Sequence, residues 1–157
     1  MMTLSKDKDI DFKTIPLFVE GNTPQSFKMV EDLASELSDT VYPLDSAKRK
    51  KLHLAAVFAN NFTNHCCTLA YHLLEKNGIA PTVLLPIIDE TAQKLHHLSP
   101  TEAQTGPAKR WDEKVMNEQL RELADEAELQ EIYRLMSQSI HQIGRAHVWT
   151  PVTIRSR

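Results

Sequence analysis

Hydrophobic and polar positions divide the chain into a short mixed α/β segment and a longer helical segment. Two short apolar, β-prone runs lie near the start, TIPLFVEG at residues 14–21 and TVYPL at residues 40–44. The stretch between them, QSFKMVEDLASELSD, has apolar residues at helical spacing, and Pro24 suits the first turn of such a helix. The order predicts a β-α-β unit with parallel strands, although two strands alone make no stable sheet.

From Asp45 onward the pattern predicts helices only. The first helix begins at Asp45 or Ser46 and ends at Asn77-Gly78, so its roughly 30 residues would span about 45 Å. A second helix is expected over residues 82–97, with Pro86 in its first turn, and Ser99-Pro100-Thr101-Glu102 has the form of a capping box. The turn TGPAKRWD then leads to helices over residues 112–124 and from residue 129. We therefore predict a mainly α protein, with residues 1–44 as the β-α-β part and residues 45–142 as a helical domain.

The last segment, IGRAHVWTPVTIRSR, does not fit this organisation. The preceding helix has the apolar stripe Leu129, Ile132, Tyr133, Met136 and Ile140. Nothing in residues 143–157 continues that periodicity, and the segment resembles the conceptual translation of a sequencing-adapter read, with Trp149 at a codon normally read as stop. We predict that residues 143–157 are a non-native tail and exclude them from fold reasoning.

Composition narrows the functional classes. A chain of 157 residues with 41% hydrophobic and 25% charged residues corresponds to one ordinary domain. Its net charge of −3 offers no basic face for phosphates, so we expect no nucleic-acid partner. The two adjacent cysteines, Cys66 and Cys67, cannot build a disulfide framework, and we expect no signal peptide because MMTLSKDKDIDF has no apolar segment of the needed length. Both features favour a reducing, cytoplasmic location.

One uncharged run, Leu52 to Leu74, is long enough to span a bilayer at roughly 20 residues. It nevertheless contains three Asn, three His and two Thr, which are costly to place in lipid. We therefore expect a helix surrounded by protein and no membrane contact.

Within this run, LHLAAVFANNFTNH contains a polar row. Counted at about 100° per residue, His53, Asn60 and Asn64 share a stripe with Val57, and Asn61 lies at its border. A separate face suited to a core consists of Leu54, Phe58, Phe62 and Leu69.

Two readings of the polar row stay open. The functional reading is a wall of an active-site cleft, in which His53 donates a proton because imidazole exchanges protons near neutral pH. Asn60, Asn61 and Asn64 would then orient a substrate through amide donors and acceptors. In the structural reading, these groups, together with His65, satisfy one another or nearby backbone across a helical dimer core.

The turn Thr105-Gly106-Pro107 is a second candidate binding element. Glycine permits a tight bend, and the start of a helix nearby presents free N–H groups. Arg110 would then hold a phosphate or carboxylate of a cofactor or substrate. The alternative is a structural clamp between Arg110 and Asp112.

A metal site is not expected. His65, Cys66, Cys67 and His72 have the right donor atoms, but adjacent cysteines on a helix point about 100° apart and cannot easily meet one ion.

Several segments together resemble one family: HLAAVFANNFTNH, LPIIDETAQK, SPTEAQTGPAKRWD and IYRLMSQSI. They are similar to the Rossmann-like predicted oxidoreductases that have a C-terminal helical domain of unknown function. The resemblance covers nearly all of residues 1–142, and MMTLSKDKDIDF resembles the last loop of the nucleotide-binding domain. In the family pattern, the positions that match best are His53, Ala56 and Asn61.

The resemblance implies an all-helical, dehydrogenase-type C-terminal domain preceded by a remnant of a Rossmann-like domain. In small NADP-dependent reductases and the 6-phosphogluconate dehydrogenase group, the helical domain closes the active-site cleft and mediates dimerisation. A homodimer is therefore expected, with His53 and Asn61 as catalytic candidates and Asn60, Asn64, Thr105, Gly106 and Arg110 as substrate-binding candidates. Related dehydrogenases often use a Lys on the equivalent helix, whereas Ala56 and its neighbours offer none.

The chain departs from the family in one respect, because the dinucleotide fingerprint is absent. That site needs clustered glycines between a strand and a helix, and the four glycines here, at positions 21, 78, 106 and 144, are far apart. We therefore expect an N-terminally truncated chain that binds no cofactor alone, with NADP or NAD bound by the full-length protein.

The function implied is that of the C-terminal part of an NAD(P)-dependent oxidoreductase, inactive alone, which forms a cleft wall and a dimer interface around an unidentified small-molecule substrate. The alternative is a non-enzymatic helical module for dimerisation or ligand sensing.

Overall fold

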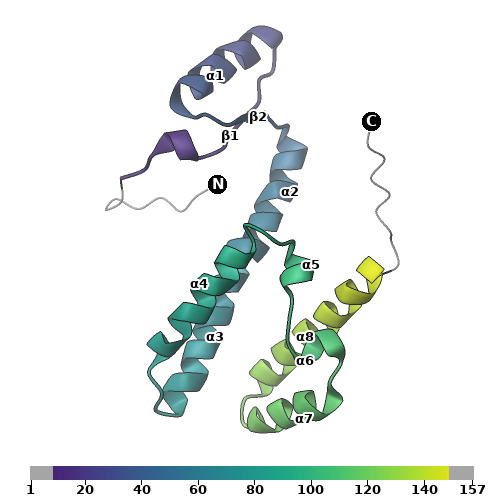
Figure 1. The fold of residues 1–157 in the computed structure, drawn as a ribbon. Coiled ribbons are helices and arrows are strands. Elements are labelled where there is room, and N and C mark those ends of the chain that lie inside the picture. The colour runs from purple at the N-terminus through teal and green to yellow at the C-terminus, as the bar shows by residue number, and fades with distance from the viewer. Residues whose placement is uncertain (1–8, 149–157) are drawn as a thin grey trace. The chain divides into compact units, whose positions relative to one another are not determined.

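The computed structural model describes residues 9–148, with side chains up to Arg145, in two compact units. Described residues up to Thr68 form the first unit and those from Leu69 the second. The prediction of a mainly α protein with a small β-α-β segment is confirmed (Figure 1). Two expectations lie outside the described residues, namely the resemblance of residues 1–8 to a nucleotide-domain loop and the assignment of Trp149.

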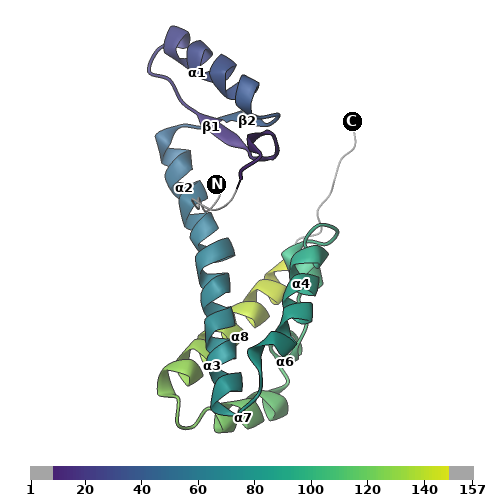
Figure 2. The same cartoon turned by 90° about the vertical axis from the view of Figure 1, so that its left-hand side faces the viewer.

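The β-α-β segment consists of β1 (Leu17–Val19), α1 (Pro24–Leu37) and β2 (Val41–Pro43), preceded by the 3-10 turn η1 (Phe12–Thr14). The strands are parallel and Leu17 pairs with Val41. Helix α1 lies against the two strands in both views (Figures 1 and 2), and Val19 and Ala34 are buried between them.

Two small residues make this packing possible. The hydroxyl of Ser38, which is 2% exposed, donates to the carbonyl of Ile15 at 2.6 Å and accepts from the N–H of Thr40 at 3.0 Å. Gly21 lies so close to the backbone of Phe27 that a β-carbon would clash there. The segment therefore depends on a buried hydroxyl and on the absence of a side chain at position 21.

The predicted long helix is present, with one interruption. It comprises α2 (Ser46–Ala56), the π-helical segment η2 (Val57–Phe62) and α3 (Thr63–Lys76). The Asp45 side chain accepts the N–H of Lys48 at 2.8 Å and thus caps the first turn, as expected. Among the described helices, none is long and apolar enough to cross a membrane.

The second unit contains the remaining elements: η3 (Pro81–Leu84), α4 (Leu85–Lys94), α5 (Pro100–Ala103), α6 (Pro107–Arg110), α7 (Glu113–Glu122) and α8 (Ala127–Val148). The capping box is confirmed, because Ser99 and Glu102 bond each other's backbone N–H groups. Asp112 caps α7. The helix expected over residues 82–97 is shorter, since a 3-10 turn precedes Leu85 and looser turns follow Lys94.

Helix α8 extends beyond the expected limit at residue 142. Its backbone stays helical to Val148, because local hydrogen bonds need no continued apolar stripe. The assignment of residues 143–157 as a non-native tail concerns their origin and stays a prediction.

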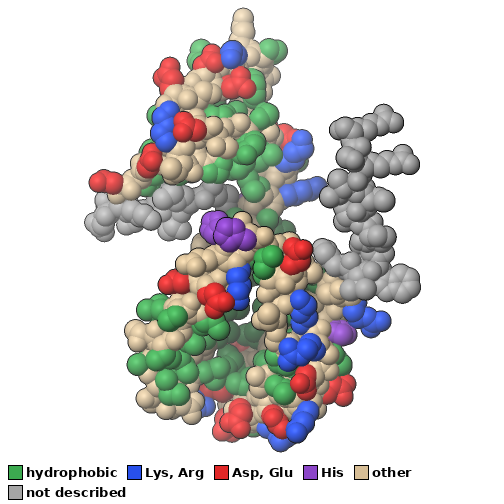
Figure 3. All heavy atoms as spheres, viewed as in Figure 1, with side chains coloured by type: hydrophobic (Ala, Val, Ile, Leu, Met, Phe, Trp, Pro, Cys, Tyr) green, Lys and Arg blue, Asp and Glu red, His purple; other side chains and the backbone are tan. Residues whose placement is uncertain are grey.

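The core is small. Among the described residues, the buried apolar side chains are Val19, Ala34, Ala108, Met116 and Leu123. Many larger apolar side chains lie on the surface, where Figure 3 shows them in green over both units. The expectation that Leu54, Phe58 and Phe62 form a core face is wrong for this chain, because they are 59%, 61% and 50% exposed. A face of this kind is typical of a surface that packs against another protein segment.

An ionic cluster that the sequence did not indicate connects two helices within the second unit. The Glu126 carboxylate, just before α8, accepts from the Lys76 ammonium at 2.7 Å and lies 3.4 Å from His72 Nε2. These contacts hold the pKa of Glu126 below its ordinary value, chiefly through the hydrogen bond from Lys76, and raise the pKa of Lys76. The cluster joins the end of α3 to the start of α8.

Glu126→Gln is expected to lower the urea midpoint at pH 7, because the neutral amide loses the charge interaction with Lys76. The folded-state pKa of Glu126 lies below its ordinary value of 4.5, so its contribution to stability is fully present above that pH. The contribution is lost as the pH falls through the lowered pKa. Urea titrations should therefore show a difference between wild type and variant that shrinks in acid. A difference that persisted at pH values below the lowered pKa of Glu126 would contradict this assignment.

Candidate functional site

The polar candidates His53, Asn60, Asn61 and Asn64 all lie on the part of the long helix that belongs to the first unit. The π-helical segment η2 runs through the middle of the row. Because a π-turn holds one more residue than an α-turn, the count of 100° per residue fails across residues 57–62. Residues after η2 are rotated relative to His53, so the predicted single stripe is not continuous.

All four candidate side chains are exposed. The Asn60 amide donates to the Asn61 carbonyl oxygen at 3.3 Å, and the Thr63 hydroxyl donates to the Phe58 carbonyl at 3.3 Å within the π-helical region. Within the described part of the chain, the imidazole of His53 makes no hydrogen bond. The row therefore presents an imidazole and several amides that can bind another molecule or another protein segment.

The start of this helix is anchored by the residue that follows β1. The Glu20 carboxylate accepts from the N–H and the hydroxyl of Ser46 at 2.9 and 2.7 Å, and it also pairs with the guanidinium of Arg49. The Ser46 hydroxyl is the main reason that the pKa of Glu20 is lowered. An anion at a helix N-terminus is stabilising, so this contact fixes how the long helix leaves the sheet.

The second candidate, the turn at residues 105–110, belongs to the other unit. Gly106 has φ 97° and ψ 177°, a conformation that favours glycine, and it begins the four-residue helix α6. Trp111 ends α6 in the left-handed region, at φ 55° and ψ 48°. Such a conformation is uncommon for a bulky residue. The Trp111 indole packs against His141 of α8, with 4.7 Å between the ring centres, and its N–H donates to Glu113 at 3.0 Å.

The alternative of an Arg110–Asp112 clamp is wrong. The Asp112 carboxylate instead accepts the N–H of Val115 at 3.2 Å as the cap of α7. Arg110 is exposed and has no acidic partner among the described side chains. Its guanidinium is therefore available to an anion.

The two sets of candidates lie in different units, His53 to Asn64 in the first and Thr105 to Arg110 in the second. In chemical terms, the first set offers a proton donor and amides, and the second offers a cation. No group of three or more metal-binding side chains converges among the residues that the structure describes.

Sequence reasoning gave no role of its own to Lys109, whose ammonium donates to the Gln104 carbonyl at 2.7 Å and closes the turn. It also missed the contact between Trp111 and His141. Neither had a sequence signal, because each depends on how α6 meets a preceding loop or a distant helix. The exposed Glu90–Lys94 pair, at 2.7 Å, has the i, i+4 spacing at which opposite charges meet on a helix surface.

Comparisons with known proteins place this geometry in context. A family model described as a domain of unknown function, DUF2520, matches residues 15–140. A solved structure from Bacteroides fragilis, provisionally named an NADP oxidoreductase, is 51% identical with a TM-score of 0.83, and the match covers 90% of this chain and 55% of that one. A protein from Thermotoga maritima, 24% identical with a TM-score of 0.74 over 87% of this chain and 56% of its own, shares the fold. No curated protein matches.

Proposed function

The chain belongs to the DUF2520 family, and from this membership we propose that it is the C-terminal part of an NAD(P)-dependent oxidoreductase. In the proposed enzyme it supplies one wall of the active-site cleft and a homodimer interface, and the protein is cytoplasmic.

The similar structure from Bacteroides fragilis supports a connection with NADP. This chain spans about 55% of the length of that protein. The sequence contains no glycine-rich dinucleotide fingerprint, so its residues do not fit a cofactor site of that kind. We assign NADP or NAD to a nucleotide-binding portion outside this sequence, and we expect this chain alone to be inactive.

The observation that carries the proposal is the exposed polar row beside an exposed apolar face on one helix. Solvent-exposed Phe58 and Phe62 stack edge to face at 4.9 Å between ring centres, whereas His53 and Asn61 lie nearby on the same helix. A π-helical segment runs through both groups, and such segments occur frequently at functional sites. The apolar face suits a protein partner and the polar row suits a small polar substrate.

The residues have distinct proposed roles. His53 donates a proton to the carbonyl oxygen or imine nitrogen of a substrate whose carbon accepts a hydride. Asn61, together with Asn60 and Asn64, orients that substrate by hydrogen bonds. Thr105, Gly106 and Arg110 form a second binding element, in which the guanidinium holds an anionic group of the substrate.

The test uses this chain joined to the part of the Bacteroides fragilis protein that the match does not cover. Oxidation of NADPH and NADH is followed by absorbance with a panel of carbonyl and imine compounds. We expect turnover with both portions present and none with either alone. Absence of turnover and of NADP(H) binding by the joined protein would overturn the proposal.

A non-enzymatic helical module for dimerisation or ligand sensing is the second candidate. The small core and the exposed apolar face favour it, because both features point to packing against a partner. Under this function the joined protein would dimerise or bind ligand without turnover.

A further inference from the structure

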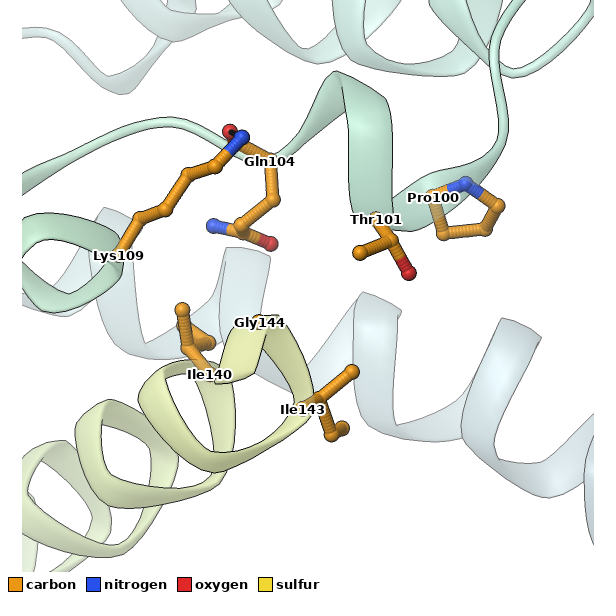
Figure 4. Close-up of a pocket in the computed structure, with 7 residues that line it drawn as sticks. All are labelled: Pro100, Thr101, Gln104, Lys109, Ile140, Ile143 and Gly144. Atoms are coloured by element: carbon orange, nitrogen blue, oxygen red, sulfur yellow. Dashed lines mark hydrogen bonds between the residues drawn. The ribbon is translucent and has the colours of Figure 1, made fainter. Parts of the chain in front are cut away.

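A hollow between α7 and α8 in the second unit contains none of the residues assigned above. Its volume is about 470 Å³. Four polar and two apolar residues line it: Asn117, Leu120 and Arg121 of α7, Ala124 just after that helix, and Gln130 and Arg134 of α8. A smaller pocket beside Ile140 (Figure 4) is formed partly by Ile143 and Gly144, which we predict to be non-native. The hollow between α7 and α8, in contrast, is formed only by residues before position 143.

Side-chain hydrogen bonds join the two helices that form the hollow. The Gln130 amide, which is half-buried, donates to the backbone carbonyl of Leu120 at 2.6 Å. The Tyr133 hydroxyl donates to the side-chain oxygen of Gln119 at 2.5 Å. Both bonds connect α8 to α7, so the protein itself holds the walls of the hollow in place.

Arg121 and Arg134 bring two positive charges to this hollow. Glu118 and Glu131 precede them by three positions, a spacing at which opposite charges can meet on a helix surface. Neither arginine nevertheless forms an ion pair in the described part of the chain. The Arg134 guanidinium instead donates to the side-chain oxygen of Gln130 at 3.1 Å, which leaves most of its five N–H donors free. The lining therefore contains two guanidiniums and no carboxylate that compensates their charge.

Two uncompensated guanidiniums favour a ligand with two negative charges. A phosphomonoester has a charge of about −1.5 to −2 at neutral pH, and its oxygens match the parallel N–H groups of a guanidinium. The Asn117 amide provides a further donor, while Leu120 and Ala124 provide apolar surface for the rest of a ligand. The volume of about 470 Å³ exceeds the roughly 150 Å³ of an engineered cavity that holds benzene in another protein. The hollow thus has room for a phosphate and a small organic body.

We propose that the hollow between α7 and α8 binds the phosphate group of a small phosphorylated molecule. Arg121 and Arg134 hold the phosphate oxygens, and the organic body lies beside Leu120. This inference goes beyond the proposed oxidoreductase function. The hollow contains none of the residues assigned to that function, so either proposal can fail without the other.

The probe is phenyl phosphate, a phosphomonoester with one aromatic ring, and phenyl sulfate is its counterpart of similar shape with a single negative charge. Binding of both to the full chain is measured by calorimetry at about pH 8, above the second phosphate pKa of about 6. Phenyl phosphate is expected to bind with a Kd of roughly 0.1–1 mM. Phenyl sulfate should bind roughly tenfold more weakly, because half the ligand charge gives half the Coulomb attraction to the two guanidiniums.

Two variants remove one guanidinium each, and Lys114→Gln is their matched control. Arg121→Gln and Arg134→Gln should each weaken binding of phenyl phosphate at least roughly tenfold. Lys114 is exposed on α7 and does not line the hollow, so its variant loses the same charge from the same helix. The Kd of this control should change less than about twofold, because solvent and salt screen an exposed charge outside the site. Arg134→Lys retains the charge without the planar fork and should have an intermediate effect.

Three results would overturn the proposal: no saturable binding of phenyl phosphate by the wild-type chain, equal binding of phenyl sulfate, or equal weakening in Lys114→Gln and in the two glutamine variants of the arginines. Equal binding of the sulfate would show that the paired guanidiniums do not select a dianion. Equal weakening in Lys114→Gln would show that phosphate is attracted by the general charge of the chain. Both arginines are exposed, so circular dichroism should show the wild-type helical content in every variant.

Discussion

Replacing His53 with glutamine is expected to lower the turnover of the joined oxidoreductase by roughly 100-fold to 10,000-fold, the range found for a lost general acid. Glutamine retains hydrogen-bonding capacity but cannot transfer a proton at neutral pH. Because the His53 side chain is exposed and makes no hydrogen bond in the described part of the chain, the melting temperature should stay unchanged. Steady-state kinetics and thermal denaturation of the same preparations provide both measurements.

His65→Gln is the matched control. His65 lies on the same helix, is exposed, and undergoes the same chemical change, so its variant should retain turnover. A melting temperature that fell in His53→Gln while turnover stayed near that of the wild type would identify His53 as a structural histidine of an interface. That result would remove the proton-donor role from the proposed mechanism.

Phe58→Glu is expected to convert the proposed homodimer to monomer at micromolar concentrations. A large aromatic residue at the centre of an interface commonly contributes about 2–4 kcal/mol, which corresponds to roughly 30-fold to 1,000-fold in Kd. The substitution also places two carboxylates in the apolar seam of a two-fold dimer. Phe58 is 61% exposed, so the fold of each chain should be retained. Light scattering after size-exclusion chromatography and circular dichroism test both statements.

Met29→Glu on α1 is the control for this experiment. Met29 is 74% exposed and lies outside the long helix, so it receives the same new charge away from the proposed seam. The dimer should persist in this variant. If the dimer persisted equally well in Phe58→Glu, the interface would not involve Leu54, Phe58 and Phe62. If the wild-type chain were monomeric at these concentrations, the proposed homodimer would be wrong.

Local signals in the sequence were sufficient for the order of the main elements. The β-α-β segment, the start of the long helix at Asp45, the capping box at Ser99 and the start of a helix near Asp112 all depend on residues within a few positions of one another. Proline and capping side chains act on the nearest backbone groups, so their effects can be read directly from the sequence. The residue types of the candidate site can likewise be read directly from the sequence.

The arrangement of that site needed the three-dimensional structure. The π-helical segment at residues 57–62 rotates Asn64 away from the stripe counted from His53, and a regular helical pattern contains no sign of the additional residue per turn. The exposure of Phe58 and Phe62 also differs from the expected core face, because an apolar pattern identifies a surface that avoids water without identifying what covers it.

The sequence by itself thus determined the helical class, the caps and the chemical groups available along each element. Only the tertiary structure decided that Glu126 joins Lys76 and that the Trp111 ring packs against His141. The physical reason is distance along the chain. Caps and turns are set by neighbouring residues, whereas the Glu126–Lys76 pair and the Trp111–His141 contact join residues 50 and 30 positions apart, whose meeting depends on the packing of whole helices.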